Sequence, residues 1–362
     1  MSERIREPDE RNNHLPRRRC RLVGRSLVLI LYSLGVQGLT HAQTNPTTSG
    51  TPSIDELEKQ LDQAKAQAKS KAAGRSMQVK VGALANANLV TLPGGNFEMG
   101  SPNVGESPVH EVRIAPFSIM KYPVTRGEFA AFVNQTQYKA ANCYGVLSIT
   151  FERLEGGAVN GRFAEEHLTW RNPGFAQDDR HPVVCVSWSD AQRYAEWLSR
   201  TTGHRWRLPS SAEYEYATRA GTKSARPWGE NPDEACEYAN VADATARMVV
   251  DASKREFFEF HNCSDNATYT SPVGSYRPNN WGLYDMLGNV SEFVQDCPHD
   301  NYNGAPTDGS AWETGPFCET HRLARGGSWI SGPNRVRSAF ANDMVVPSMA
   351  TNDSGFRLVR VN

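Results

Sequence analysis

Six cysteines between residues 143 and 318 limit the possible folds more than any other feature of the sequence. They are Cys143, Cys185, Cys236, Cys263, Cys297 and Cys318, and a seventh, Cys20, lies near the N-terminus. An even set of this kind is typical of a protein that folds in an oxidising compartment. Spacing alone does not choose among the possible pairings. A thiolate metal site is disfavoured, because the Cys-x-x-Cys spacing of such sites is missing.

The N-terminal 42 residues have the pattern of a secretory signal peptide, which predicts a periplasmic or secreted protein. A cluster of arginines precedes an apolar run from Leu27 to Leu39, and Thr40-His41-Ala42 offers a small residue for cleavage after Ala42. The run is short for a membrane span, so we expect none after cleavage. The alternative is an uncleaved N-terminal anchor.

Residues 43–76 are predicted to form a linker with a short helix. Residues 43–52 are rich in Thr, Pro, Ser and Gly, as flexible linkers are. Ser53 and Glu56 form a capping box for a helix over residues 53–73. Its apolar stripe is weak, which favours a solvated spacer and leaves weak self-association through 53–73 as the alternative.

Residues 77–362 are predicted to form one loop-rich α+β domain. Val90–Gly100 predicts two strands around a Pro-Gly-Gly turn, and Val109–Ile114 alternates as a further strand. Three helices are expected, and each begins at a capping box: Thr125 with Glu128, Ser187 with Asp190, and Ser210 with Glu213. We expect the last two to end at Gly203 and Gly221. Turns and short strands follow, and disulfides or metal ions are the natural means of holding them.

Several motifs in this domain resemble the formylglycine-generating enzyme (sulfatase-modifying factor) family. Leu92-Pro93-Gly94-Gly95 matches its opening, Gly282–Glu292 reads Gly-Leu-Tyr-Asp-Met-Leu-Gly-Asn-Val-Ser-Glu, and Arg325–Ser331 with Gly355-Phe356-Arg357 matches its end. The resemblance implies the family's variant of the C-type lectin fold, which is α+β and low in regular secondary structure. It also implies that neighbouring cysteines pair as Cys143–Cys185, Cys236–Cys263 and Cys297–Cys318.

The copper chemistry of this family does not transfer to the chain. In its best-known members a copper-binding cysteine pair follows the Gly-Gly-Ser turn, and here the two positions are Ser331 and Val336. Copper(I) requires soft thiolate ligands, which neither residue supplies. We therefore expect no copper, and a true formylglycine-generating oxidoreductase is kept only as an alternative. The pocket candidates are Ser328, Ser331 and Arg335, and the catalytic residues remain unknown.

The resemblance implies two structural calcium sites. The first takes the side chains of Asn240 and Asp265 with the carbonyls of Val241 and Ala267. The second takes the side chains of Asp285 and Glu292 with the carbonyls of Gly288 and Val290. Calcium prefers such oxygen ligands. The alternative for Asp285 and Glu292 is that they only cap backbone groups in a tight turn.

Three functions remain open. The first is an exported enzyme-family member without copper, similar to the cysteine-less relative in periplasmic siderophore (pyoverdine) maturation. It would act on a peptide-like or small extracytoplasmic ligand. The second is a lectin-fold module of the cell envelope that binds a ligand or protein through the C-terminal segment. Its surface would be Asn334, Arg335, Arg337, Ser338, Phe340, Asn342 and Asp343. The third is an envelope structural or regulatory protein presented by the N-terminal helix.

The formal net charge of −1 argues against a nucleic-acid partner for any of these functions. The shape of the site would separate catalysis from binding. A pocket beside Ser328 and Ser331 with convergent polar groups would favour catalysis. A flat, exposed aromatic surface would favour binding.

Overall fold

The computed structural model describes residues 53–153, 159–162, 167–341 and 343–361. The predicted signal peptide (1–42) and Asn342 lie outside these residues. Within the described residues, no helix combines the length and the apolar character that crossing a bilayer requires. The chain divides into two units after Asp62, and the sheets and the candidate site all belong to the second, Gln63–Asn362.

Helix α2 (Ile54–Ala87) occupies the predicted linker and is 34 residues long. It begins as predicted, because the Ser53 hydroxyl accepts the backbone N–H of Glu56 at 3.2 Å. The expected end at residue 73 was wrong. Residues 74–87 supply no stop signal beyond single glycines, and one glycine costs a helix only about 1 kcal/mol.

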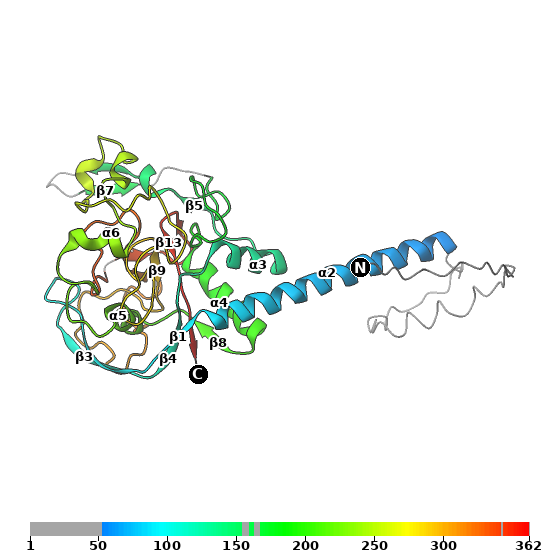
Figure 1. Cartoon of the computed structure of the whole chain (residues 1–362), viewed down its shortest axis with the longest axis horizontal. Coiled ribbons are helices and arrows are strands. Elements are labelled where there is room, and N and C mark those ends of the chain that lie inside the picture. The colour runs from blue at the N-terminus through cyan, green and yellow to red at the C-terminus, as the bar shows by residue number, and fades with distance from the viewer. Residues whose placement is uncertain (1–52, 154–158, 163–166, 342, 362) are drawn as a thin grey trace, which may run out of the picture. The chain divides into compact units, whose positions relative to one another are not determined.

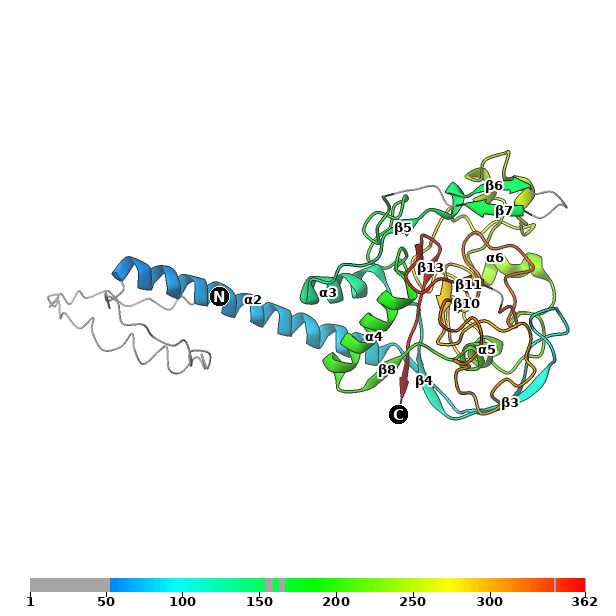
Figure 2. The same ribbon diagram turned by 180° about the vertical axis from the view of Figure 1, so that it is seen from behind.

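Two four-stranded sheets form the centre of the domain (Figures 1 and 2). The first is antiparallel, in the order β1 (Leu89–Leu92), β4 (Phe117–Met120), β14 (Val359–Val361) and β8 (Arg205–Arg207). The second has the order β11 (Asp343–Val345), β10 (Arg322–Arg325), β9 (Ser291–Phe293) and β13 (Ser354–Gly355), and its β9–β13 pair is parallel. The C-terminal residues are thereby built into both sheets.

The described residues also form three two-stranded ladders. They are β2 (Gly95–Met99) with β3 (His110–Ile114), β5 (Cys143–Tyr144) with β12 (Ala350–Thr351), and β6 (Thr150–Arg153) with β7 (Val159–Arg162). The strands predicted over 90–100 and 109–114 are confirmed. Gly94 turns the chain between β1 and β2 with φ 73°, and a Cβ there would lie 2.5 Å from the carbonyl oxygen of Ile114. Only glycine therefore fits this turn.

After β4, the described residues of the domain form four α-helices: α3 (Arg126–Thr136), α4 (Trp188–Thr202), α5 (Ser211–Arg219) and α6 (Ala235–Tyr238). The first three carry the three predicted capping boxes. Helix α4 ends at Gly203 as predicted, whereas α5 ends one position early because Ala220 adopts the left-handed cap. Short 3-10 turns occur at Val146–Ser148, Pro232–Glu234, Ala246–Met248 and Arg255–Phe257.

Aromatic packing and disulfides hold these short elements together. Helices α3 and α4 pack through buried rings that reach the C-terminal segment: Phe129, Phe132, Tyr194, Trp197 and Phe356. The disulfides are Cys143–Cys185, Cys236–Cys263 and Cys297–Cys318, the pairs that the resemblance implies. Each closes a segment with little regular structure. The crosslink stabilises the fold because it reduces the conformational freedom of the unfolded chain. The predicted α+β class, low in regular structure, is confirmed.

Candidate functional site

The terminal motifs of the domain are built around two buried arginines. Arg325 pairs with Glu215 at 3.0 Å and Arg357 with Glu292 at 2.7 Å, and all four side chains are fully buried. Arg357 also donates to the backbone carbonyls of Tyr284 and Asp285. A buried charge is tolerated only when its donors and acceptors are matched in this way. These arginines therefore belong to the scaffold.

The Gly-Gly-Ser turn brings together the two positions where the family carries cysteines. A Cβ on Gly327 would lie 3.0 Å from the Cβ of Ser331 and 3.4 Å from a methyl group of Val336. The Ser331 hydroxyl accepts the backbone N–H of Ser328 at 3.0 Å. Val336 is fully buried in an apolar cluster with Val241. The positions are thus adjacent, but one is a hydroxyl used by the turn and the other has no ligand atom.

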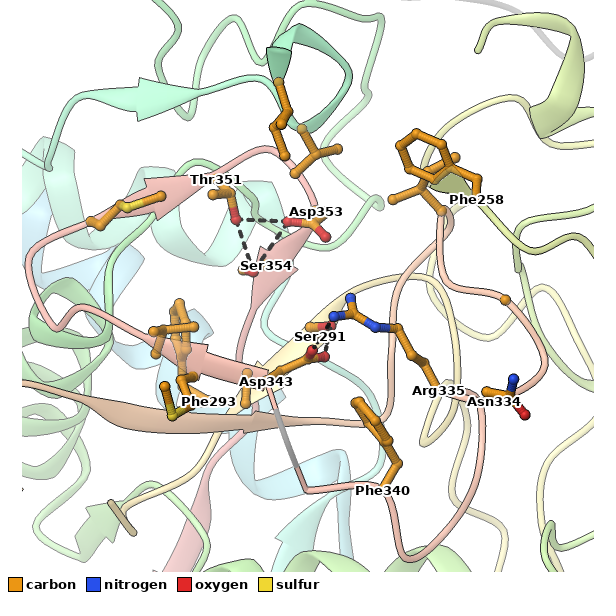
Figure 3. A pocket seen from close by; sticks show the side chains of 18 of the residues that line it. Phe258, Ser291, Phe293, Asn334, Arg335, Phe340, Asp343, Thr351, Asp353 and Ser354 are labelled. Atoms are coloured by element: carbon orange, nitrogen blue, oxygen red, sulfur yellow. Dashed lines mark hydrogen bonds and ion pairs between the residues drawn. The ribbon is translucent and has the colours of Figure 1, made fainter. Parts of the chain in front are cut away.

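A hollow of about 1080 Å³ opens beside this turn. Figure 3 shows Phe258, Phe293 and Phe340 around it, together with polar side chains that come from strands and from loops. Of the predicted pocket residues, Arg335 lines the hollow. Ser328 and Ser331 lie buried behind the lining residues. This is a concave site with convergent polar groups, and not a flat aromatic surface.

Asp353 connects the buried turn with the hollow. Its carboxylate accepts hydroxyl groups from Ser328 at 3.0 Å, Thr351 at 2.7 Å and Ser354 at 3.3 Å. The described part of the chain places no lysine or arginine in an ion pair with it. Hydroxyl donors stabilise the negative charge without neutralising it. The hollow therefore contains a carboxylate whose charge is not compensated by a cation.

Asp343 is the second carboxylate of the hollow, and it has a basic partner. Arg335 reaches it at 3.2 Å, and Ser291 contributes a hydroxyl at 3.5 Å (Figure 3). Burial raises the pKa of Asp343, the charge of Asp353 adds to this rise, and Arg335 opposes it. Asp343 and Arg335 face the hollow as part of the binding surface that the sequence predicted.

The sequence did not indicate Asp353 or Ser291 as hollow residues. Asp353 lies in the turn between β12 and β13, just before Gly355-Phe356-Arg357, and Ser291 stands where the family motif has tryptophan. The nearness of Asp353 to a matched motif, and the loss of a large side chain at Ser291, were the available signals. Neither signal places a residue in a cavity without the fold.

The first predicted calcium site has one side-chain oxygen that lacks a hydrogen-bond partner among the described residues. Asn240 is fully buried, and no described residue donates a hydrogen bond to its side-chain oxygen. The Asp265 carboxylate accepts the N–H groups of Val241 and Ala267, both at 2.8 Å. Burial raises the pKa of Asp265 to about 7, and the nearby carboxylate of Asp243 contributes to the rise. The four predicted residues lie together and fit a hard cation, with Asp243 as an additional oxygen donor that the sequence did not indicate.

The second predicted calcium site fits less well. Both oxygens of Glu292 accept hydrogen bonds from Arg357 at 2.7 Å. Asp285 accepts the backbone N–H of Gly274 at 2.8 Å, which is the capping role of the alternative reading. The carbonyl of Gly288 accepts the N–H of Val290 at 2.8 Å. Calcium at this second site stays a prediction. A bound ion would share the Glu292 carboxylate with the guanidinium of Arg357.

Comparison with known proteins agrees with this geometry. Residues 76–362 match the family described as sulfatase-modifying factor enzyme 1-like domain. The chain is 34% identical over 297 residues to a formylglycine-generating enzyme of Thermomonospora curvata, covering 74% of this chain and 92% of the relative. It is 31% identical over 300 residues to inactive C-alpha-formylglycine-generating enzyme 2 of Bos taurus, covering 75% and 87%. The structure of PvdO from Pseudomonas aeruginosa superposes with a TM-score of 0.59 at 36% identity, covering 76% and 94%.

Proposed function

The chain belongs to the formylglycine-generating enzyme (sulfatase-modifying factor) family, and we propose that it is an exported member that works without copper. It acts on, or binds, a peptide-like or small extracytoplasmic ligand in the hollow beside the Gly-Gly-Ser turn. The relatives include an enzyme named as inactive, so membership alone does not assign the copper reaction.

One observation carries the proposal against copper. Ser331 and Val336 are adjacent and buried at the positions of the family's cysteine pair, and they offer no thiolate. Each of the six cysteines in the described part of the chain lies in a disulfide, so none of them supplies a replacement. Soft thiolate ligands are what selects copper(I) in a protein.

The hollow supports a ligand-handling role. It is large enough for a small molecule or a short peptide, is lined mostly by apolar side chains, and carries three carboxylates and an arginine. Asp343 and Asp353 are positioned for proton transfer or for holding a charged group. We place the chemistry of this protein, where it has one, at these acids.

Export is supported by the three disulfides together with the signal-like N-terminus. The test is expression of the full chain in a bacterial host with a C-terminal tag, followed by N-terminal sequencing of the protein in each compartment. We expect a periplasmic or secreted protein that begins at Gln43. A full-length protein held in the cytoplasm with reduced cysteines would contradict export.

The copper test compares the native protein with a variant in which the pair is restored, Ser331→Cys with Val336→Cys. Both are loaded anaerobically with copper(I), passed through a desalting column and analysed for copper and for free thiols. We expect stoichiometric copper only in the variant. Copper retained by the native chain at one equivalent would contradict the proposal.

A binding module is the second candidate, because four of the seven residues of the predicted binding surface line the hollow: Asn334, Arg335, Phe340 and Asp343. The two functions differ in what happens to the ligand. Small molecules captured from an extracytoplasmic extract are released by denaturation and identified by mass spectrometry before and after prolonged incubation with the protein. A ligand that is chemically altered indicates an enzyme, and one that is recovered unchanged indicates a binding module.

A further inference from the structure

The charged side chains around the hollow are unequal in sign. Three are carboxylates, Glu259, Asp343 and Asp353, and one is the guanidinium of Arg335. Arg335 is engaged by Asp343 at 3.2 Å, and Glu259 accepts the side-chain amide of Asn334 at 2.7 Å. Among the described residues, only hydroxyl groups donate to the Asp353 carboxylate. The position in the hollow that most favours a cation is therefore the Asp353 carboxylate.

The surroundings of Asp353 also determine from which side such a cation can approach the carboxylate. Three hydroxyl groups hold the carboxylate from the protein side, which fixes its orientation before a ligand arrives. A primary ammonium has three N–H donors on a compact head and can approach a single carboxylate from the open side. A preorganised carboxylate loses little conformational entropy when the ion pair forms.

The rest of the ligand must match an apolar wall. Phe258, Phe293 and Phe340 face the hollow (Figure 3), and Met344 and Met349 also line it. Met344 and Val346 are large apolar side chains with 54% and 41% exposure, and both are at this hollow. Exposed apolar surface of this kind is stabilised by an apolar or aromatic partner. Thioethers pack well against aromatic rings of varied shape.

We propose that the hollow binds a ligand that carries a primary ammonium group on an apolar or aromatic body, with the ammonium at Asp353 and the body against Phe258, Phe293 and Phe340. This inference rests on the proposed function, since it names the chemical class of the ligand at the same site. The source of the ammonium can be a free amine or a lysine side chain in a peptide.

The test uses two pairs of probes that differ only in charge. The first pair is 4-phenylbutylamine and the neutral 4-phenylbutanol. The second is acetyl-Phe-Lys-Phe-amide and the same peptide with the lysine acetylated. Binding is followed on the full chain by NMR of ¹³C-labelled methionine methyl groups. Met344 and Met349 report on the hollow, and the buried Met120 and Met286 serve as internal controls.

We expect each cationic probe to shift Met344 and Met349, and to bind at least about tenfold more tightly than its neutral partner. Asp353→Asn should remove that difference and leave the affinity for the neutral probe unchanged. The matched control is Asp308→Asn, because Asp308 is an exposed carboxylate that also accepts a serine hydroxyl, at 2.6 Å, away from the hollow. It should bind all probes like the native protein. Whichever cationic probe binds more tightly identifies the source.

Each other outcome has a distinct meaning. Equal affinity for charged and neutral probes at Met344 and Met349 overturns the ammonium inference and leaves the proposed function standing. If no probe shifts these two methyl groups, the hollow is not a ligand site and the proposed function fails with the inference. If Asp353→Asn does not fold, the comparison of charged with neutral probes on the native protein still decides whether the hollow prefers an ammonium group.

Discussion

Two arginines of the C-terminal segment, Arg357 and Arg335, pair with carboxylates in opposite surroundings. Arg357 and Glu292 are fully buried, 2.7 Å apart, and the remaining donors of Arg357 are taken by backbone carbonyls. Arg335 and Asp343 are 3.2 Å apart at the edge of the hollow, with 56% and 13% of their side chains exposed. The first pair is matched on every side, whereas the second lies next to the uncompensated Asp353.

This difference separates the residues that hold the fold from those that are available to a ligand. A buried pair contributes specificity of packing, and removing one partner leaves an uncompensated charge in the core. A half-exposed pair in a hollow can be rearranged by water or by a ligand at little cost. The buried arginines of the family's matched motifs therefore belong to the scaffold, and we expect any chemistry of the chain at the half-exposed residues of the hollow.

The contrast between the two ion pairs predicts that substitution of Arg357 causes the largest loss of stability. Arg357→Met leaves Glu292 without its cation, and we expect the free energy of unfolding to fall by about 3–5 kcal/mol. Urea unfolding measures the loss. The control is Arg180→Met, because Arg180 pairs with Asp178 at 2.8 Å while the two side chains are 76% and 49% exposed. That variant should lose less than about 1 kcal/mol. Equal losses in the two variants would remove the distinction between scaffold and surface charges.

Asp296 is a buried scaffold carboxylate that forms no hydrogen bond with a described arginine. It tests the same distinction through the pH dependence of stability. Burial raises the pKa of Asp296 to about 6, although its carboxylate accepts the N–H groups of Ser211 and Trp312. The folded state therefore binds the proton more tightly than the unfolded state. This contribution to stability is complete below the ordinary pKa of an aspartate and is lost as pH rises to about 6.

We expect this loss to be on the order of 3 kcal/mol between pH 4 and 6.5. The measurement is the difference between the native protein and Asp296→Asn in urea unfolding at each pH, which cancels the titration of the other carboxylates. A difference that does not change with pH would show that Asp296 has an ordinary pKa in the folded protein.

The first predicted calcium site is a third environment, in which the carboxylate of Asp243 is buried, that of Asp265 is half-buried, and neither forms an ion pair with a described lysine or arginine. We expect calcium at a hundredfold excess over its dissociation constant to stabilise the fold by about 2.7 kcal/mol. Asn240→Ala should abolish this increment, because it removes the side-chain oxygen that lacks a donor. Magnesium is the matched control ion, since it demands a tighter octahedral site and should stabilise less. Thermal unfolding with each ion decides, and equal gains from the two ions would contradict a dedicated calcium site.

The local parts of the fold could be predicted from the sequence because short-range chemistry determines them. The capping boxes at Thr125, Ser187 and Ser210 each satisfy backbone groups within three residues, and all three helices begin there. The strands on either side of Gly94 were also found. Their partners were not, because β1 pairs with β4 and β2 with β3, and such pairing depends on contacts distant in sequence.

The hollow could be predicted only in part for the same reason. Its charged residues come from β11, from the turn between β12 and β13, from the loop after the Gly-Gly-Ser turn, and from the loop after the 3-10 turn at Arg255–Phe257. The resemblance led to Arg335, but no periodicity or spacing connects it with Asp353 or Phe258. The burial of a side chain also determined its role where the residue type alone allowed several. Ser331 became part of a turn, and Glu292 became the partner of Arg357.

The smallest effect on stability is expected at Asp353. Asp353→Asn keeps an oxygen acceptor for Thr351 and Ser354 and turns its amide N–H toward the Ser328 hydroxyl, which can accept it. It also removes a charge that no basic side chain of the described chain compensates. We expect the free energy of unfolding to change by less than about 1 kcal/mol. The same urea titration that reports on Arg357→Met measures it. A loss close to that of Arg357→Met would place Asp353 in the scaffold, and the hollow would then have no free carboxylate to offer a ligand. A loss near zero, combined with loss of discrimination between charged and neutral probes, would identify a residue that is retained for binding and contributes little to the fold.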